Sequence, residues 1–140
     1  MKIILTVSDN YGMLFNHRRV SRDKAVTEDI LKMIGDTPLY ISSFSSVLFE
    51  GYDKVITDDS FLEHAQNDSY CFVENQDLSA FSNQIDTFII YHWNRNYPFD
   101  TTFNPELLNG FDMIESVEFS GNSHETITKT IYQRNALTLA

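Results

Sequence analysis

The sequence predicts a single-domain α/β protein with a mostly parallel central sheet flanked by helices and a C-terminal antiparallel hairpin. Three observations support this fold class. The length of 140 residues suits one domain. Strand-like and helical segments alternate as far as Gly110, which is typical of a parallel sheet. Two strand-like segments then follow one another. We expect the domain to span residues 1–134 and residues 135–140 to form a frayed tail.

The first third of the chain predicts a strand, a loop and a helix. Residues 2–7 are β-branched and aliphatic, which indicates a buried strand. Residues 8–20 are polar and read as a loop. Ser21 has the side chain of a helix N-cap, and Asp23 would lie in the first turn. Val26 and Ile30 follow at helical spacing, and Gly35 marks the expected end.

The rest of the chain predicts shorter elements. Apolar runs indicate strands, and the turns between them contain Gly, Pro, Asn and Asp. Gly121 and Asn122 separate the last two strands, which predicts a hairpin. The expected strands are residues 38–42, 54–57, 70–73, 87–92, 113–119 and 126–134, and the expected helical segments are residues 46–50, 60–66, 77–81 and 104–110.

Composition excludes several classes of protein. The formal net charge of -10 repels nucleic acid and anionic lipid at long range. The single cysteine, Cys71, cannot form an internal disulfide and lies in an apolar run, so we interpret it as a core residue. His and Cys show no zinc-type spacing, so no metal is expected. No segment approaches the roughly 20 apolar residues of a membrane span, and no signal-peptide pattern follows Met1. We therefore expect a cytoplasmic protein.

Basic residues are concentrated before the predicted helix. Arg18, Arg19, Arg22 and Lys24 follow His17 within a few residues. Guanidinium groups and free backbone N–H groups at a helix start can bind an anion, with Asp23 beside them. A solvated basic face that balances an acidic surface explains the same pattern.

A second candidate site follows the strand at residues 87–92. His92, Trp93 and Arg95 lie just beyond its carboxyl end, where ligands bind in parallel sheets. Trp93 could stack on a planar ring and Arg95 could contact a phosphate. The alternative is an aromatic loop that packs on its own domain. If both segments border one cleft, His17 and His92 form a candidate acid/base pair. His124 follows a turn and is expected to be exposed.

The order of elements, with its closing hairpin, resembles dihydrofolate reductase and its relatives. The stretches that carry the resemblance are residues 3–7 with Asp9-Asn10-Tyr11-Gly12-Met13, then Asp36-Thr37-Pro38-Leu39-Tyr40-Ile41, then residues 88–92 with Phe99-Asp100-Thr101-Thr102-Phe103, and finally residues 113–134. They span nearly the whole chain. The resemblance implies a central sheet, a mobile loop after the first strand, and a cleft for cofactor and substrate.

The ligand-binding motifs of that family are changed in this sequence. The family holds the cofactor phosphate with a glycine and an arginine after its second strand, where this chain has Ser42-Ser43-Phe44-Ser45. A glycine pair approaches the pyrophosphate after its fourth strand, where this chain has Glu74-Asn75-Gln76-Asp77. Asp23 and Glu28 lie nearest to the position of the family's substrate-binding acid. The resemblance therefore implies a degenerate dinucleotide site, and we expect no cofactor.

Three functions agree with these observations. The first is a reductase-like protein that binds a small anionic or planar ligand, or a protein partner, in the cleft. The second is a small metal-independent ribonuclease or phosphodiesterase, or an RNA- or nucleotide-binding protein, that uses His17 and His92 with arginines on the phosphate. The third is an NADPH-dependent reductase with a divergent cofactor site. The acidic charge disfavours the second, and the missing glycines disfavour the third.

Overall fold

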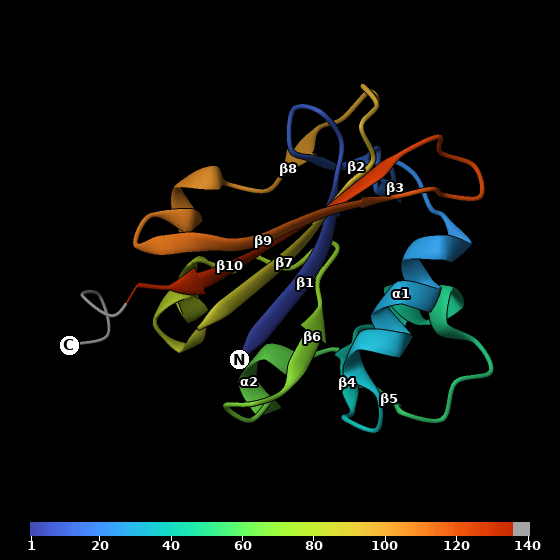
Figure 1. The fold of residues 1–140 in the computed structure, drawn as a ribbon. Coiled ribbons are helices and arrows are strands. Elements are labelled where there is room, and N and C mark those ends of the chain that lie inside the picture. Colours follow the sequence, from blue (N-terminus) through green and yellow to red (C-terminus); the bar gives the residue numbers. More distant parts are fainter. Residues whose placement is uncertain (136–140) are drawn as a thin grey trace.

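A seven-stranded mixed sheet forms the centre of the molecule (Figure 1). The computed structural model describes residues 1–135. The strand order is β5-β4-β6-β1-β7-β10-β9. The strands are β1 (Lys2–Val7), β4 (Leu39–Ile41), β5 (Val55–Thr57), β6 (Tyr70–Phe72), β7 (Thr87–His92), β9 (Phe111–Phe119) and β10 (Ile127–Arg134).

The pairing of the strands confirms the predicted class. β1 pairs in parallel with β6 and β7, and β4 pairs in parallel with β5 and β6. β10 is antiparallel to both β7 and β9, so the C-terminal hairpin forms one edge of the sheet. The register of β9 and β10 shifts between Ile131 and Tyr132. The parallel part of the sheet brings the carboxyl ends of β4, β6, β1 and β7 to one side, where the candidate site lies.

A second, small sheet corrects the prediction of an irregular loop at residues 8–20. β2 (Gly12–Phe15) pairs with β3 (Arg18–Arg19) and with β8 (Thr101–Thr102). The turn between β2 and β3 holds Asn16 and His17, both with positive φ (53° and 64°). Positive φ at both central residues is what a two-residue hairpin turn requires, and Asn tolerates it well. The strands were missed because they are short and show little alternation of apolar and polar residues.

One helix, α1 (Lys24–Ile34), packs against a face of the large sheet (Figure 1). Val26, Ile30 and Ile34 are buried, which confirms the predicted spacing. Gly35 ends the helix with a φ of 56°. The predicted N-cap, Ser21, is wrong: Asp23 has extended backbone and accepts a hydrogen bond from the N–H of Ala25. Asp23 directly precedes the first helical residue, Lys24, and is therefore the cap.

The two faces of the sheet carry separate apolar clusters. Ile4 and Tyr91 contribute to the cluster under α1, whereas Ile3 and Ile90 contribute to the opposite cluster. The remaining helices are short, and they are η1 (Ser43–Phe49), α2 (Phe61–His64), η2 (Ser79–Gln84) and η3 (Pro105–Leu108). None of the helices in the part of the chain that is described could cross a membrane.

Strand β10 is the last element of the described residues. β10 ends at Arg134, and the N–H of Asn135 still donates to the carbonyl of Gly110 at 2.7 Å. Residues 136–140, which make up most of the predicted tail, lie outside the described residues.

Candidate functional site

A hollow beside α1 is the first part of the candidate site. It has a cavity volume of about 20 Å³ and lies between α1, η1 and the ends of β6 and β7. We call it the α1 hollow. Its apolar walls are formed by Val26, Ile30, Leu48, Phe49, Phe72 and Trp93, and its polar lining includes Thr6, Ser21, Arg22, Asp23, Thr27 and Glu74. This combination of apolar walls with a few polar groups is typical of small-molecule sites.

Two further depressions adjoin the α1 hollow. The outer groove has a cavity volume of about 370 Å³ and shares Arg22, Asp23, Thr27 and Leu48 with it, while Lys24 adds a second cation. The β6 hollow, with a cavity volume of about 230 Å³, lies on the other side of Glu74 and is lined by residues 73–78 with Phe103. Glu74 lines both the α1 hollow and the β6 hollow.

Trp93 lies inside the domain, where the sequence predicted a surface for stacking on a ligand. It is 2% exposed, and its ring stacks on the His124 ring at 4.6 Å with an interplanar angle of 23°. The protein thus already provides one stacking partner. The indole Nε1 is buried and has no hydrogen-bond partner among residues 1–135. A buried N–H without an acceptor is destabilising, so an acceptor supplied by a ligand would remove that cost.

The Asp23 carboxylate fixes the β9–β10 loop against α1. It accepts hydrogen bonds from the backbone N–H groups of Asn122 (2.9 Å), Ser123 (2.9 Å) and His124 (3.1 Å), besides that of Ala25. Burial alone would raise the pKa of Asp23. The hydrogen bonds from these four residues outweigh burial and lower the pKa below its usual value of 3.8. Asp23 is therefore an ionised carboxylate used within the protein, and no longer a group free to bind a ligand.

His124 is buried, so the expectation that it is exposed is wrong. Its Nδ1 lies 2.9 Å from Asp23 Oδ2. Its Nε2 lies 3.0 Å from Ser21 Oγ and 2.9 Å from Tyr97 OH. The loop carries His124 inward because Asp23 binds three of its consecutive N–H groups. Four side chains from three segments of the chain thus meet at one point.

Arg19 is occupied by a buried ion pair. Its Nε and Nη2 lie 2.9 and 3.0 Å from the two carboxylate oxygens of Glu74, and Nη2 also donates to the carbonyl of Phe44. Ser45 Oγ donates to the same carboxylate at 2.8 Å. The guanidinium additionally stacks on the Phe44 ring. The prediction that Arg19 holds an external anion does not match this geometry, because its donors already have partners.

The remaining candidates are more exposed. Arg18, Arg22 and Arg95 are exposed, and of these three only Arg22 lines the α1 hollow. His17 is exposed on the β2–β3 turn. His92 is half-buried, its Nε2 lies 3.1 Å from Thr130 Oγ1, and burial lowers its pKa.

His92 and Trp93 point to different faces of the sheet. Successive side chains of a strand alternate, and Tyr91 and Trp93 both belong to the cluster under α1. No hydrogen bond joins His17 to His92 within residues 1–135. The structure therefore brings together Arg22, Asp23 and Trp93, and it does not bring the two histidines to them.

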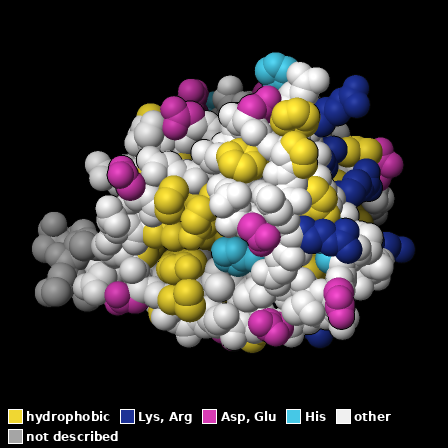
Figure 2. Space-filling view, turned by 90° about the horizontal axis from the view of Figure 1, so that it is seen from above, with side chains coloured by type: hydrophobic (Ala, Val, Ile, Leu, Met, Phe, Trp, Pro, Cys, Tyr) yellow, Lys and Arg dark blue, Asp and Glu magenta, His cyan; other side chains and the backbone are white. Residues whose placement is uncertain are grey.

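The surface charge is distributed unevenly around this region. Figure 2 shows Lys and Arg side chains gathered on the side where α1 lies, with carboxylates and apolar groups over the rest of the visible face. No group of three or more His, Cys, Asp or Glu side chains within residues 1–135 is arranged to hold a metal ion.

Comparison with known proteins identifies the fold. The sequence matches no protein-family model and no curated protein sequence. Its structure is similar to that of a dihydrofolate reductase from Enterococcus faecalis complexed with NADP(H) and RAB-propyl. The TM-score is 0.68, and the similarity covers 96% of each chain. The chain has the dihydrofolate reductase fold. The sequence identity is 7%, so the similarity concerns the fold alone.

The dihydrofolate reductase fold confirms the resemblance predicted from the sequence, and it shows which site residues the sequence did not reveal. Tyr97 and His124 were not expected to share a site with Ser21. The only sequence signal for Ser21 was its resemblance to a helix cap. Asp23 and His124 are 101 positions apart, and no local pattern links them.

Proposed function

We propose that this chain is a ligand-binding protein that takes a small planar molecule with an anionic group in the outer groove, where the groove meets the α1 hollow, without using a dinucleotide. The observation that carries the proposal is the buried, unpartnered indole N–H of Trp93. Trp93 lines the hollow, so a ligand with a hydrogen-bond acceptor would satisfy this group. Phe49 and Phe72 form apolar walls that suit a flat ring.

The anionic part of the ligand is proposed to meet Arg22. This side chain lines both the α1 hollow and the outer groove, and Lys24 follows in the groove. A guanidinium binds a carboxylate or phosphate through two parallel hydrogen bonds. The formal net charge of -10 makes these cations a local exception, so they favour an anion at this place.

The size of the site and the Arg19–Glu74 pair both argue against a dinucleotide. The α1 hollow has a cavity volume of about 20 Å³, which holds roughly one water molecule and is far below the roughly 300–1,000 Å³ of drug-sized sites. Glu74 separates it from the β6 hollow. A dinucleotide that extended across both would have to displace a buried ion pair, and breaking such a pair costs about 3–5 kcal/mol.

Calorimetric titration with 6-carboxypterin and with NADPH tests the proposal. 6-Carboxypterin combines a planar ring, hydrogen-bond acceptors and one carboxylate. We expect it to bind, and we expect NADPH to bind more weakly than micromolar, which corresponds to about −8 kcal/mol. Trp93 is the single tryptophan, so quenching of its fluorescence would report binding in the hollow directly.

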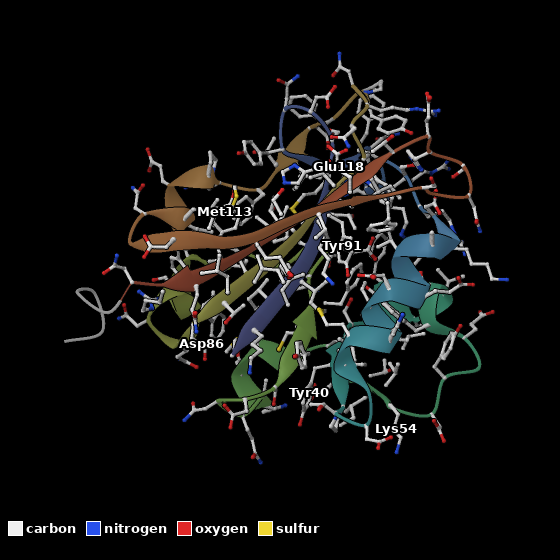
Figure 3. The ribbon with its side chains drawn as sticks, viewed as in Figure 1. Tyr40, Lys54, Asp86, Tyr91, Met113 and Glu118 are labelled. Carbon is white, nitrogen blue, oxygen red and sulfur yellow. The ribbon has the colours of Figure 1, made fainter. Side chains whose placement is uncertain are left out.

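Matched variants locate the binding site. Arg22→Ala should weaken 6-carboxypterin binding by roughly 10- to 150-fold, because the loss of a charge-assisted hydrogen bond costs about 1.5–3 kcal/mol. Lys54→Ala is the control, since Lys54 is an exposed cation at the opposite end of the sheet (Figure 3). Micromolar NADPH binding, or 6-carboxypterin binding that Arg22→Ala leaves unchanged, would contradict the proposal. Binding and cleavage of single-stranded RNA, lost in His17→Ala and His92→Ala, would instead support the ribonuclease alternative.

A further inference from the structure

Ser21, His124 and Asp23 form a chain of hydrogen bonds. Ser21 Oγ lies 3.0 Å from His124 Nε2, and His124 Nδ1 lies 2.9 Å from Asp23 Oδ2. The hydroxyl and the carboxylate thus contact opposite nitrogens of one imidazole. A nucleophile, a base and a group that orients the base are recognised by this geometry, whatever the fold or the order in the sequence.

The hydrogen bonds determine which nitrogen of His124 carries the proton. Asp23 is ionised and can only accept, so Nδ1–H donates to it. In the neutral ring, Nε2 then has a lone pair, which faces the hydroxyls of Ser21 and Tyr97. Stacking on Trp93 and the contact with Tyr97 hold the ring in this orientation. Nε2 can therefore accept the proton of Ser21, in competition with the Tyr97 hydroxyl, which also lies 3.3 Å from Ser21 Oγ.

Ser21 is accessible from the α1 hollow, while His124 lies behind it. Ser21 is half-buried and lines the hollow, and His124 is buried and does not. Within residues 1–135, the backbone N–H of Arg22 has no protein acceptor. The N–H of the residue after the nucleophile commonly binds the oxyanion in serine hydrolases. The nucleophile faces the ligand space, and the base is shielded from water.

We propose that Ser21 is the nucleophile of an acyl-transfer site, with His124 as general base and Asp23 as a positioning residue. The substrate class is a small carboxylic ester whose acyl group enters the α1 hollow and whose anionic part contacts Arg22. This inference rests on the proposed function, because ester and ligand would use the same hollow.

The reaction has two steps. In the first, Ser21 Oγ attacks the ester carbonyl carbon while His124 Nε2 takes the hydroxyl proton. The bond to the leaving oxygen breaks, and that oxygen leaves with the proton returned by His124. In the second, water attacks the acyl-serine carbon and gives its proton to His124. The bond to Ser21 Oγ breaks, Ser21 recovers a proton, and a carboxylic acid is released.

Covalent labelling of the protein with a fluorophosphonate probe tests the proposal. The Ser21 oxygen displaces fluoride from phosphorus, and mass spectrometry with peptide mapping locates the adduct. We expect a single adduct on Ser21, hydrolysis of p-nitrophenyl acetate, and loss of both in Ser21→Ala. The lost hydroxyl is half-buried, and an unchanged melting temperature would show that this variant folds. A labelled Tyr97, or an unlabelled folded protein, would overturn the proposal.

Two further variants separate catalysis from structure. His124→Gln retains an amide that can hydrogen-bond but cannot act as a base, and it should slow labelling by about 100-fold or more. His64→Ala is the matched control, because His64 Nδ1 also contacts a carboxylate, that of Asp58 at 2.6 Å, and has no serine partner within residues 1–135. His64→Ala should label at the normal rate. Equal labelling of folded His124→Gln and of the unaltered protein would refute the role of His124 as base.

The two proposals can fail separately. If 6-carboxypterin binds and Ser21 is not labelled, the acyl-transfer inference is wrong and the binding function stands. If Ser21 is labelled and 6-carboxypterin does not bind, the planar ligand is wrong, and labelling of Arg22→Ala then shows whether the ester itself uses this hollow.

Discussion

Replacement of Arg19 by alanine should destabilise the protein strongly. The Arg19 side chain is 18% exposed and its partner Glu74 is 5% exposed, so both charges lie largely away from water. Arg19→Ala removes two of the three side-chain hydrogen bonds to the Glu74 carboxylate and leaves only that from Ser45. An uncompensated buried charge costs about 3–5 kcal/mol. We expect a loss of that size in the free energy of unfolding.

Equilibrium unfolding in urea, combined with a double-mutant cycle, measures this loss. Arg19→Met with Glu74→Leu removes both charges and should destabilise less than Arg19→Ala alone, because no buried charge is left unpaired. Arg18→Ala is the matched control: Arg18 is the exposed neighbour on β3, and its loss should stay within about 0.5 kcal/mol. The reasoning is refuted if Arg19→Ala costs no more than Arg18→Ala, or if the two charges contribute additively.

Three further predictions concern stability and reactivity. Asp23→Ala should lower the free energy of unfolding by several kcal/mol at neutral pH. Because folding lowers the pKa of Asp23, the difference in unfolding free energy from the unaltered protein should shrink as the pH falls below about 4. Urea titrations measure this difference, and a difference that stays constant with pH would contradict the prediction. Ile30→Ala should lower the free energy of unfolding by about 2–5 kcal/mol, and a loss below about 0.5 kcal/mol would show that Ile30 does not pack on the sheet. Cys71 should react with a thiol reagent only after unfolding, because burial raises the pKa of its thiol to about 12, and rapid reaction of the native protein would show an accessible thiol.

The elements with a clear pattern of buried apolar residues were predictable from the sequence. The expected strand at residues 87–92 coincides with β7. It was predictable because a central strand is apolar on both faces and appears in the sequence as a continuous run of apolar residues. The face of α1 was equally clear from Val26, Ile30 and Ile34. β2 and β3 were missed because their formation depends on the positive φ angles of Asn16 and His17. Such a turn has a weak signature when it lacks glycine.

The candidate site was predicted less well, because its polar residues pair over long separations. Of the basic segment, Arg22 lines the α1 hollow. The partner of Arg19 lies 55 positions away, and that of Asp23 lies 101 positions away. A charged residue without a nearby partner in the sequence can be fully paired in the folded protein. The topology of the fold determines which charged residues are paired in this way.

The hydrogen bonds of Asp23 and Glu74 help to locate the candidate site. The sequence resemblance implied positions near the substrate and the pyrophosphate for Asp23 and Glu74, but in the structure both carboxylates accept hydrogen bonds from the protein itself. Buried polar groups nearly always have partners, so the exceptions are informative. Within residues 1–135 the buried side-chain atoms without a partner are Ser42 Oγ, at the end of β4, and Trp93 Nε1. Trp93 lines the α1 hollow, where Ser21 and Arg22 also lie. The unsatisfied donor, the accessible hydroxyl and the free cation thus coincide, which favours this hollow over the β6 hollow as the functional site.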